Sequence, residues 1–177
     1  MSPARPINMG IGLQASKGTP PMYPIVYRLH EMLAELRRAN KRGVKYGPRL
    51  DPFTKKMEHH DGFDLPCRVG TDIHSPWDGV VERVFDEPTR GGRSLVISHR
   101  EVKLKSGYAH LHEVMDDIVP GALVQRGQLV ARTGISGRST GAHLHFTIRL
   151  PIISDNDWFK VDPMPFLEKA EVQEVIL

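Results

Sequence analysis

The chain of 177 residues, 40% hydrophobic and 25% charged, is long enough for one domain with a packed core and too short for two. Its apolar stretches have the length of strands, which excludes a membrane-spanning helix, and its single cysteine, Cys67, excludes an intrachain disulfide and a cysteine-rich metal site. The net charge of +3 is too weak to indicate nucleic-acid binding. We therefore expect a globular domain without membrane insertion or a nucleic-acid partner.

The first 45 residues differ in composition from the rest. Residues 1–22 are rich in Pro, Gly and small polar residues and predict an extended arm without the apolar run of a secretory signal. Residues 23–45 predict a basic amphipathic helix with a stop near Gly43. Seven Lys or Arg against two Glu lie between Arg28 and Arg49. They form either the solvated face of that helix or a docking surface for an anionic wall polymer or an assembly partner.

From Tyr46 onward, short strands are separated by glycine turns. This pattern predicts a mainly β fold, an antiparallel sheet or sandwich core carrying the N-terminal helix and short peripheral elements. The domain would cover 46–167 and leave a tail at 168–177. The predicted strands are 80–85, 94–99, 108–111, 122–124, 128–133 and 143–150. After Pro151 we expect irregular chain until a short closing helix begins at Pro165.

The strand that begins at His143 carries two histidines two residues apart. Side chains at this spacing on a strand point to the same face, so His143 and His145 share one surface while Leu144 and Phe146 face the core. The preceding glycine-rich segment, 134–141, predicts a loop that a ligand could approach closely.

A second group of candidate ligands lies at His60 and Asp64, with Gly62 between them to let the backbone bend. Catalytic zinc takes three His or carboxylate ligands and leaves one position for water. His60, Asp64 and His145 would meet that count, and His110 and His143 could bond to the water and accept its proton. Spacing leaves open which of His143 and His145 is the ligand.

These motifs resemble those of the M23 peptidases, the lysostaphin- and LytM-like zinc enzymes that cut peptidoglycan peptides. The resemblance covers about 46–167 and rests on these segments: Tyr46-Gly47-Pro48-Arg49, His60-Asp61-Gly62-Phe63-Asp64, Gly79-Val80-Val81, Tyr108-Ala109-His110-Leu111, Val119-Pro120-Gly121, 124–128, 139–146 and Val161-Asp162-Pro163.

The resemblance implies one zinc ion held by His60, Asp64 and His145, with His110 and His143 catalytic. It gives no catalytic role to the other histidines, namely His30, His59, His74, His99 and His112. We also expect Arg49 to bind substrate. The chain departs from the family pattern at 70–73 and in a shortened hairpin at 91–94, which concerns substrate preference rather than the metal site.

The resulting hypothesis is a zinc metalloendopeptidase that hydrolyses peptidoglycan peptides. The alternative is a non-catalytic module of the same fold in a virion or cell-wall complex. Because no secretory signal is found, we expect a phage lysin or a virion tail enzyme, made in the host cytoplasm and acting at the cell wall or periplasm. Residues 1–45 would then contact tail or baseplate proteins. The sequence leaves open whether glycine bridges or D-amino-acid cross-links are cut, although the lack of a separate wall-binding domain favours the latter.

Overall fold

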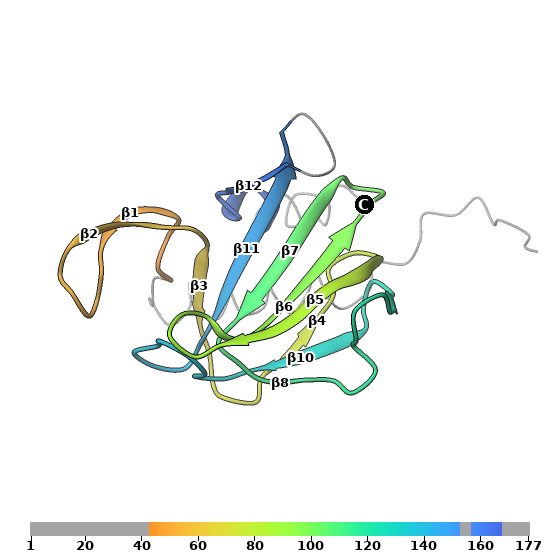
Figure 1. Ribbon diagram of the computed structural model, residues 1–177, viewed down its shortest axis with the longest axis horizontal. Coiled ribbons are helices and arrows are strands. Elements are labelled where there is room, and N and C mark those ends of the chain that lie inside the picture. The colour runs from red at the N-terminus through yellow and green to blue at the C-terminus, as the bar shows by residue number, and fades with distance from the viewer. Residues whose placement is uncertain (1–42, 153–156, 168–177) are drawn as a thin grey trace, which may run out of the picture.

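The computed structural model describes residues 43–152 and 157–167, which form twelve strands (Figure 1). All pairings between these strands are antiparallel. The expected mainly β, antiparallel fold is therefore confirmed.

A seven-stranded sheet is the largest element, with the order β12-β11-β7-β6-β5-β9 and β3 added beside β11. Its strands are β3 (Phe63–Pro66), β5 (Gly79–Glu87), β6 (Gly92–His99), β7 (Leu104–Ala109), β9 (Leu123–Val124), β11 (His143–Pro151) and β12 (Trp158–Val161). One edge of β11 pairs with β7, and the other is divided between β3, near its start, and β12, near its end. The long strand β11 is thus held along both edges.

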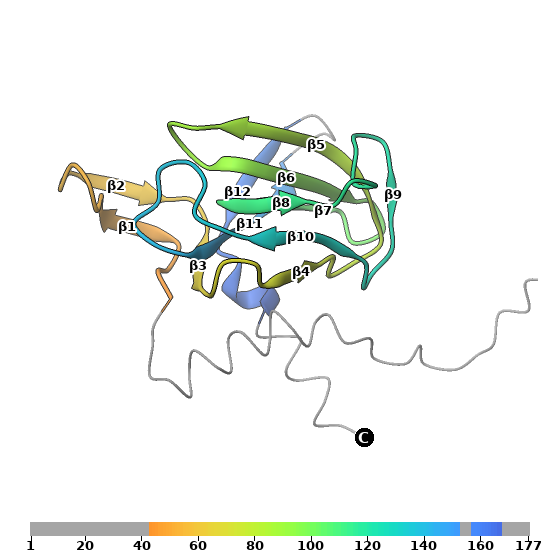
Figure 2. The ribbon, with the colours of Figure 1, turned by 90° about the horizontal axis from the view of Figure 1, so that it is seen from below.

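Two smaller sheets complete the domain. The three-stranded sheet, in the order β4-β10-β8, consists of β4 (Asp72–His74), β8 (Leu111–Val114) and β10 (Leu129–Thr133), and it lies across one face of the large sheet (Figure 2). The hairpin of β1 (Gly47–Leu50) and β2 (Met57–His60) projects beside β3 (Figure 1).

The core lies between the large and the three-stranded sheets. Its largest fully buried side chains include Leu95, Tyr108, Phe146 and Ile148 from the former, and Val130 from the latter. Burial of this apolar surface is the main stabilising contribution. Because the core occupies one face of the large sheet, the other face of β7 and β11 is free to carry polar side chains.

The predicted strands all exist, with bounds that differ by a few residues, but strand 108–111 is interrupted at His110 between β7 and β8. The expectation of irregular chain after Pro151 is wrong, because β12 pairs with the end of β11. A single helical turn at 164–167 stands where the closing helix was expected.

The predicted arm at 1–22, most of the helix at 23–45 and the tail at 168–177 lie outside the described residues. Residues 43–45, which the range 23–45 includes beyond the predicted stop near Gly43, are not helical, and Val44 bridges to Asp64. In the part of the chain that the structure describes, no helix is long and apolar enough to cross a membrane.

Candidate metal and active site

Strand β11 places the candidate ligands on the face of the large sheet that is turned away from the core. Leu144 and Phe146 are fully buried, while His143 and His145 point to the opposite face, as the alternation predicts. In the β-ladder, His145 lies opposite Asp64 of β3 on one side and opposite Ala109 of β7 on the other. Sheet register therefore brings a candidate ligand from each of two strands together.

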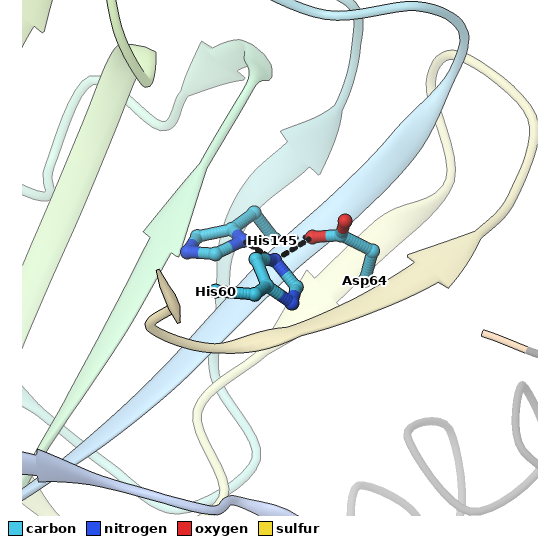
Figure 3. Close-up of side chains that lie close together, drawn as sticks. All are labelled: His60, Asp64 and His145. Carbon is cyan, nitrogen blue, oxygen red and sulfur yellow. Dashed lines mark hydrogen bonds and ion pairs between the residues drawn. The ribbon is translucent and has the colours of Figure 1, made fainter. Parts of the chain in front are cut away.

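Three potential ligands converge here, His60 at the end of β2, Asp64 of β3 and His145 of β11 (Figure 3). Asp64 Oδ1 lies 2.7 Å from His145 Nδ1 and 3.1 Å from His60 Nε2, and the two imidazole nitrogens are 3.2 Å apart. One ligand atom from each residue lies within 4.8 Å of the others. This is the set of residues that spacing and resemblance had predicted.

The glycine between the two ligand positions has a different role from the predicted bend. A Cβ at Gly62 would lie 2.7 Å from His145 Cε1 and 2.6 Å from the Phe146 carbonyl oxygen. Only a residue without a side chain lets β11 and the imidazole approach this closely. Gly62 is thus needed for packing of the ligand.

Electrostatics of the three residues fit a cation. Burial alone would raise the pKa of Asp64, but hydrogen bonds from His145 and His60 hold that pKa well below its usual range. Burial likewise would lower the pKa of His145, yet hydrogen bonds to Asp61 and Asp64 raise it. Imidazole protons thus supply positive charge beside the carboxylate, and a bound cation would displace these protons and take the ring lone pairs and the carboxylate as ligands.

Each of the two candidate histidine ligands has its second ring nitrogen occupied. His60 Nδ1–H donates to the Lys45 carbonyl oxygen (2.8 Å), so Nε2 is the atom that faces the cluster and could bind a cation. His145 Nε2–H donates to Asp61 Oδ1 (3.0 Å), and Lys160 of β12 forms an ion pair with the other oxygen of Asp61. Such partners set the tautomer and ring orientation of a metal-binding histidine.

His110 and His143 lie beside the cluster, with ring centroids 4.6 Å apart. His143 Nδ1–H donates to the Gly141 carbonyl (2.8 Å), and His110 Nδ1–H donates to the Ser136 carbonyl (2.8 Å). In both rings the Nε2 atom is therefore left as a proton acceptor. Burial, together with the neighbouring His143 and His145, lowers the pKa of His110, which favours its neutral form.

The backbone at His110 is unusual, with a φ of 59° in the left-handed region. This conformation costs a non-glycine residue about 1 kcal/mol or more. It is held by the His110 N–H, which donates to the Gly91 carbonyl (2.7 Å). The chain turns out of β7 here, so the imidazole is directed toward His143 rather than along the strand.

The loop between β10 and β11 supplies both carbonyl oxygens that orient these rings. Arg138 in the loop donates two hydrogen bonds of 2.8 Å to Asp51, which follows β1, and its guanidinium stacks on Phe53. The Arg138 hydrogen bond also lowers the pKa of the Asp51 carboxyl. The β1–β2 hairpin and the loop are thereby joined.

A groove of about 820 Å³ runs over the cluster. Its lining includes His60, Asp64, His110, His143 and His145, together with Arg138 on the loop and Arg149 further along β11. The candidate site is therefore open to a substrate along an extended path rather than enclosed.

The family model for "Peptidase family M23" matches residues 58–163, which is more than half of the chain. The chain belongs to peptidase family M23. The resemblance drawn from the motifs is thus confirmed.

Curated relatives match with moderate identity. The M23 chain is 39% identical over 100 residues to peptidoglycan DD-endopeptidase ShyB of Vibrio cholerae, a match that covers 56% of this chain and 22% of the relative. It is 28% identical over 141 residues to lysostaphin of Staphylococcus simulans, covering 80% of this chain and 27% of lysostaphin. The chain spans only about a fifth to a third of the length of the curated relatives it matches.

Solved structures agree on the fold. The catalytic domain of lysostaphin from Staphylococcus simulans matches with a TM-score of 0.61 and 27% identity, covering 76% of this chain and 97% of that domain. A zinc-containing peptidase from Vibrio cholerae matches with a TM-score of 0.57 and 34% identity, covering 68% of this chain and 35% of that one.

The remaining predicted positions of the M23 domain lie as follows. Arg49 lines the groove, where its Nη1 donates to Asp64 (3.1 Å) and its Nε donates to Glu58 (2.8 Å). His99 is buried away from the cluster, between the Asp78 carbonyl and the Ser106 hydroxyl. His59 packs on Tyr46, and His74 and His112 are not among the clustered residues; His30 lies outside the described residues.

Two residues next to the ligands were missed from sequence, namely Asp61 and Lys160. Asp61 lies inside the His60–Asp64 motif, so its position near the site could have been predicted. Its hydrogen bond to His145 could not, because the two residues are 84 positions apart in the sequence. Lys160 carried no signal, because it lies in a segment expected to be irregular.

Proposed function

We propose that this chain is a zinc metalloendopeptidase that hydrolyses peptide bonds of bacterial peptidoglycan. The proposal rests on one arrangement: three convergent ligand atoms lie beside two imidazoles whose Nε2 atoms are free to take a proton, all along one groove. The names of the relatives, a peptidoglycan DD-endopeptidase and lysostaphin, support the same substrate class.

One zinc ion, bound by His60, Asp64 and His145, suits this mixture of imidazole and carboxylate ligands. When bound, zinc supplies Lewis-acid chemistry, lowering the pKa of a water to about 7 and polarising a carbonyl group. Asp61 and the Lys45 carbonyl hold the two imidazole ligands in the tautomers that binding requires.

The chain's own residues move the proton. His143 Nε2, which lies 3.6 Å from Asp64 Oδ1, accepts the proton of the attacking water as the oxygen bonds to the scissile carbonyl carbon. When the C–N bond breaks, the imidazolium of the His110–His143 pair returns the proton to the leaving amine. The same positive charge stabilises the oxyanion before that step.

The test combines elemental analysis with release of new amino termini from purified cell wall. We expect one zinc per chain, and a loss of about 10²–10⁴-fold in rate for His143→Ala or His110→Ala with zinc retained. His145→Ala should lose both zinc and activity, whereas replacement of the exposed His112 of β8, His112→Ala, serves as the control. If zinc-loaded protein releases no amines, the proposal fails; metal content near zero would instead support the non-catalytic alternative.

Arg49 is a further proposed substrate contact. A guanidinium has five N–H donors, and the hydrogen bonds to Glu58 and Asp64 use two of them, so others remain for a substrate carbonyl in the groove. Arg49→Lys should raise KM more than it lowers kcat. A fall of kcat in proportion to the zinc content would show instead that Arg49 positions Asp64 for metal binding and does not contact the substrate.

The biological setting remains a prediction. A phage lysin or a virion tail enzyme would use residues 1–45 to contact tail or baseplate proteins. One similar structure is the prophage-encoded M23 protein EnpA from Enterococcus faecalis, with a TM-score of 0.55 and 27% identity. Mass spectrometry of purified virions would detect a tail component and would exclude that role if the chain is absent.

A further inference from the structure

A row of three cations crosses the large sheet on its groove face. Arg149 of β11 lies directly opposite Lys160 of β12 on one side and opposite Lys105 of β7 on the other. All three belong to the same cross-strand row, and Arg149 shares its face of β11 with His145 because the two are four residues apart. Like charges at adjacent cross-strand positions repel one another, so this row needs compensating anions.

Among the described residues, the two outer cations, Lys105 and Lys160, have partners, whereas the central Arg149 does not. Lys160 pairs with Asp61, and Lys105 pairs with Glu82 at 2.6 Å while its ammonium lies over the Trp158 ring. Arg149 makes no hydrogen bond or ion pair with any residue between 43 and 152 or between 157 and 167. A guanidinium flanked by two cations and left without a carboxylate is a binding position for an anion.

Arg149 stands in the same groove as the metal ligands. Four residues of extended strand separate it from His145, a distance of about 13 Å. Thr147 lies between them, opposite Gly107 of β7, and a Cβ at position 107 would be 2.4 Å from Thr147 Oγ1. Gly107 has no side chain and that of Thr147 is small, so neither projects far into the groove. An extended peptide bound at the cluster can therefore reach Arg149 along the groove lining.

We propose that Arg149, flanked by Lys105 and Lys160, binds a free carboxylate of the substrate peptide three to four residues from the scissile bond. The inference rests on the proposed function and narrows its substrate class to carboxylate-bearing stem peptides, as opposed to uncharged glycine bridges. Arginine suits this role because its planar N–H groups match the two oxygens of a carboxylate.

The test uses cross-linked stem peptides in which each free carboxylate in turn is replaced by its carboxamide. Affinities are measured by fluorescence anisotropy on the His143→Ala background, so that the peptides stay intact, and hydrolysis rates are measured with wild type. We expect one replacement, and not the others, to weaken binding about tenfold. In Arg149→Gln, that peptide and its carboxamide should bind equally well.

Arg100→Gln is the matched control, since it removes the same charge from an exposed loop outside the groove. The subsite is overturned if no carboxylate replacement matters, or if Arg149→Gln weakens every peptide by the same factor. Selective binding without hydrolysis by wild type would contradict the proposed peptidase activity and leave the subsite standing. Hydrolysis without carboxylate selectivity would support the peptidase activity and contradict the subsite at Arg149.

Discussion

Replacing Asp61 by asparagine should weaken zinc binding without disturbing the fold. The carboxylate accepts a 3.0 Å hydrogen bond from His145 Nε2 and is itself paired with Lys160. Asparagine keeps the shape and one acceptor oxygen but removes the charge that makes His145 a stronger ligand. Loss of an outer partner of this kind costs 10–100-fold in metal affinity.

The structure places the expected loss toward the lower end of that range. The Asp61 side chain is 45% exposed, so water screens its charge. We therefore expect about a 10–30-fold rise in the zinc dissociation constant, equivalent to about 1.4–2 kcal/mol. Competition with a chromophoric chelator at fixed pH measures this constant, and thermal melting of the metal-free protein reports separately on folding.

Asp72→Asn is the matched control. Asp72 pairs with Arg132 at 2.9 Å and is similarly exposed, but it lies on β4, which carries no candidate ligand. Its replacement should leave zinc affinity unchanged. The reasoning is refuted if Asp61→Asn binds zinc as tightly as wild type, or if Asp72→Asn weakens binding to the same extent.

Three further predictions concern the loop, the core and pH. Arg138→Ala, which releases the loop from Asp51, should lower kcat about tenfold with zinc content unchanged, as steady-state kinetics and elemental analysis would show. Leu144→Ala, at a fully buried position of β11, should cost about 2–5 kcal/mol in denaturant unfolding. Burial lowers the pKa of His99 despite its hydrogen bond to the Asp78 carbonyl. The folded state thus binds fewer protons, and stability should fall as pH drops below about 6.5, by at most about 1.4 kcal/mol per pH unit. His99→Asn should flatten that dependence in melts between pH 5 and 8; an unchanged slope would contradict it.

The elements that could be predicted from sequence are those with a local pattern. Alternation along 143–150 placed His143 and His145 on one face, and the glycine turns marked most strands of the large sheet. Strand β12 escaped prediction because its short sequence has little alternation and follows Pro151. The β1–β2 hairpin escaped prediction because its short strands, Gly47–Leu50 and Met57–His60, carry few apolar residues and so show no alternating pattern.

The candidate ligands could be predicted, but their orientation could not. Nothing local indicates that His110 adopts a positive φ, because that conformation depends on the Gly91 carbonyl in a distant turn. The link between Arg138 and Asp51 joins positions 87 apart. Such contacts follow from the way strands assemble in three dimensions and cannot be predicted from the spacing of residues in the sequence.

Three of the four histidines around the candidate site have their protons held by the main chain. The acceptors are the carbonyl oxygens of Lys45, Ser136 and Gly141, which belong to the backbone whatever side chain stands there. The Nε2 proton of His145 is held by a side chain instead, that of Asp61. Substitutions at positions 45, 136 and 141 therefore keep these backbone acceptors in place, whereas a single codon change at position 61 removes the acceptor of the His145 proton. Engineering of metal affinity in this domain should start there.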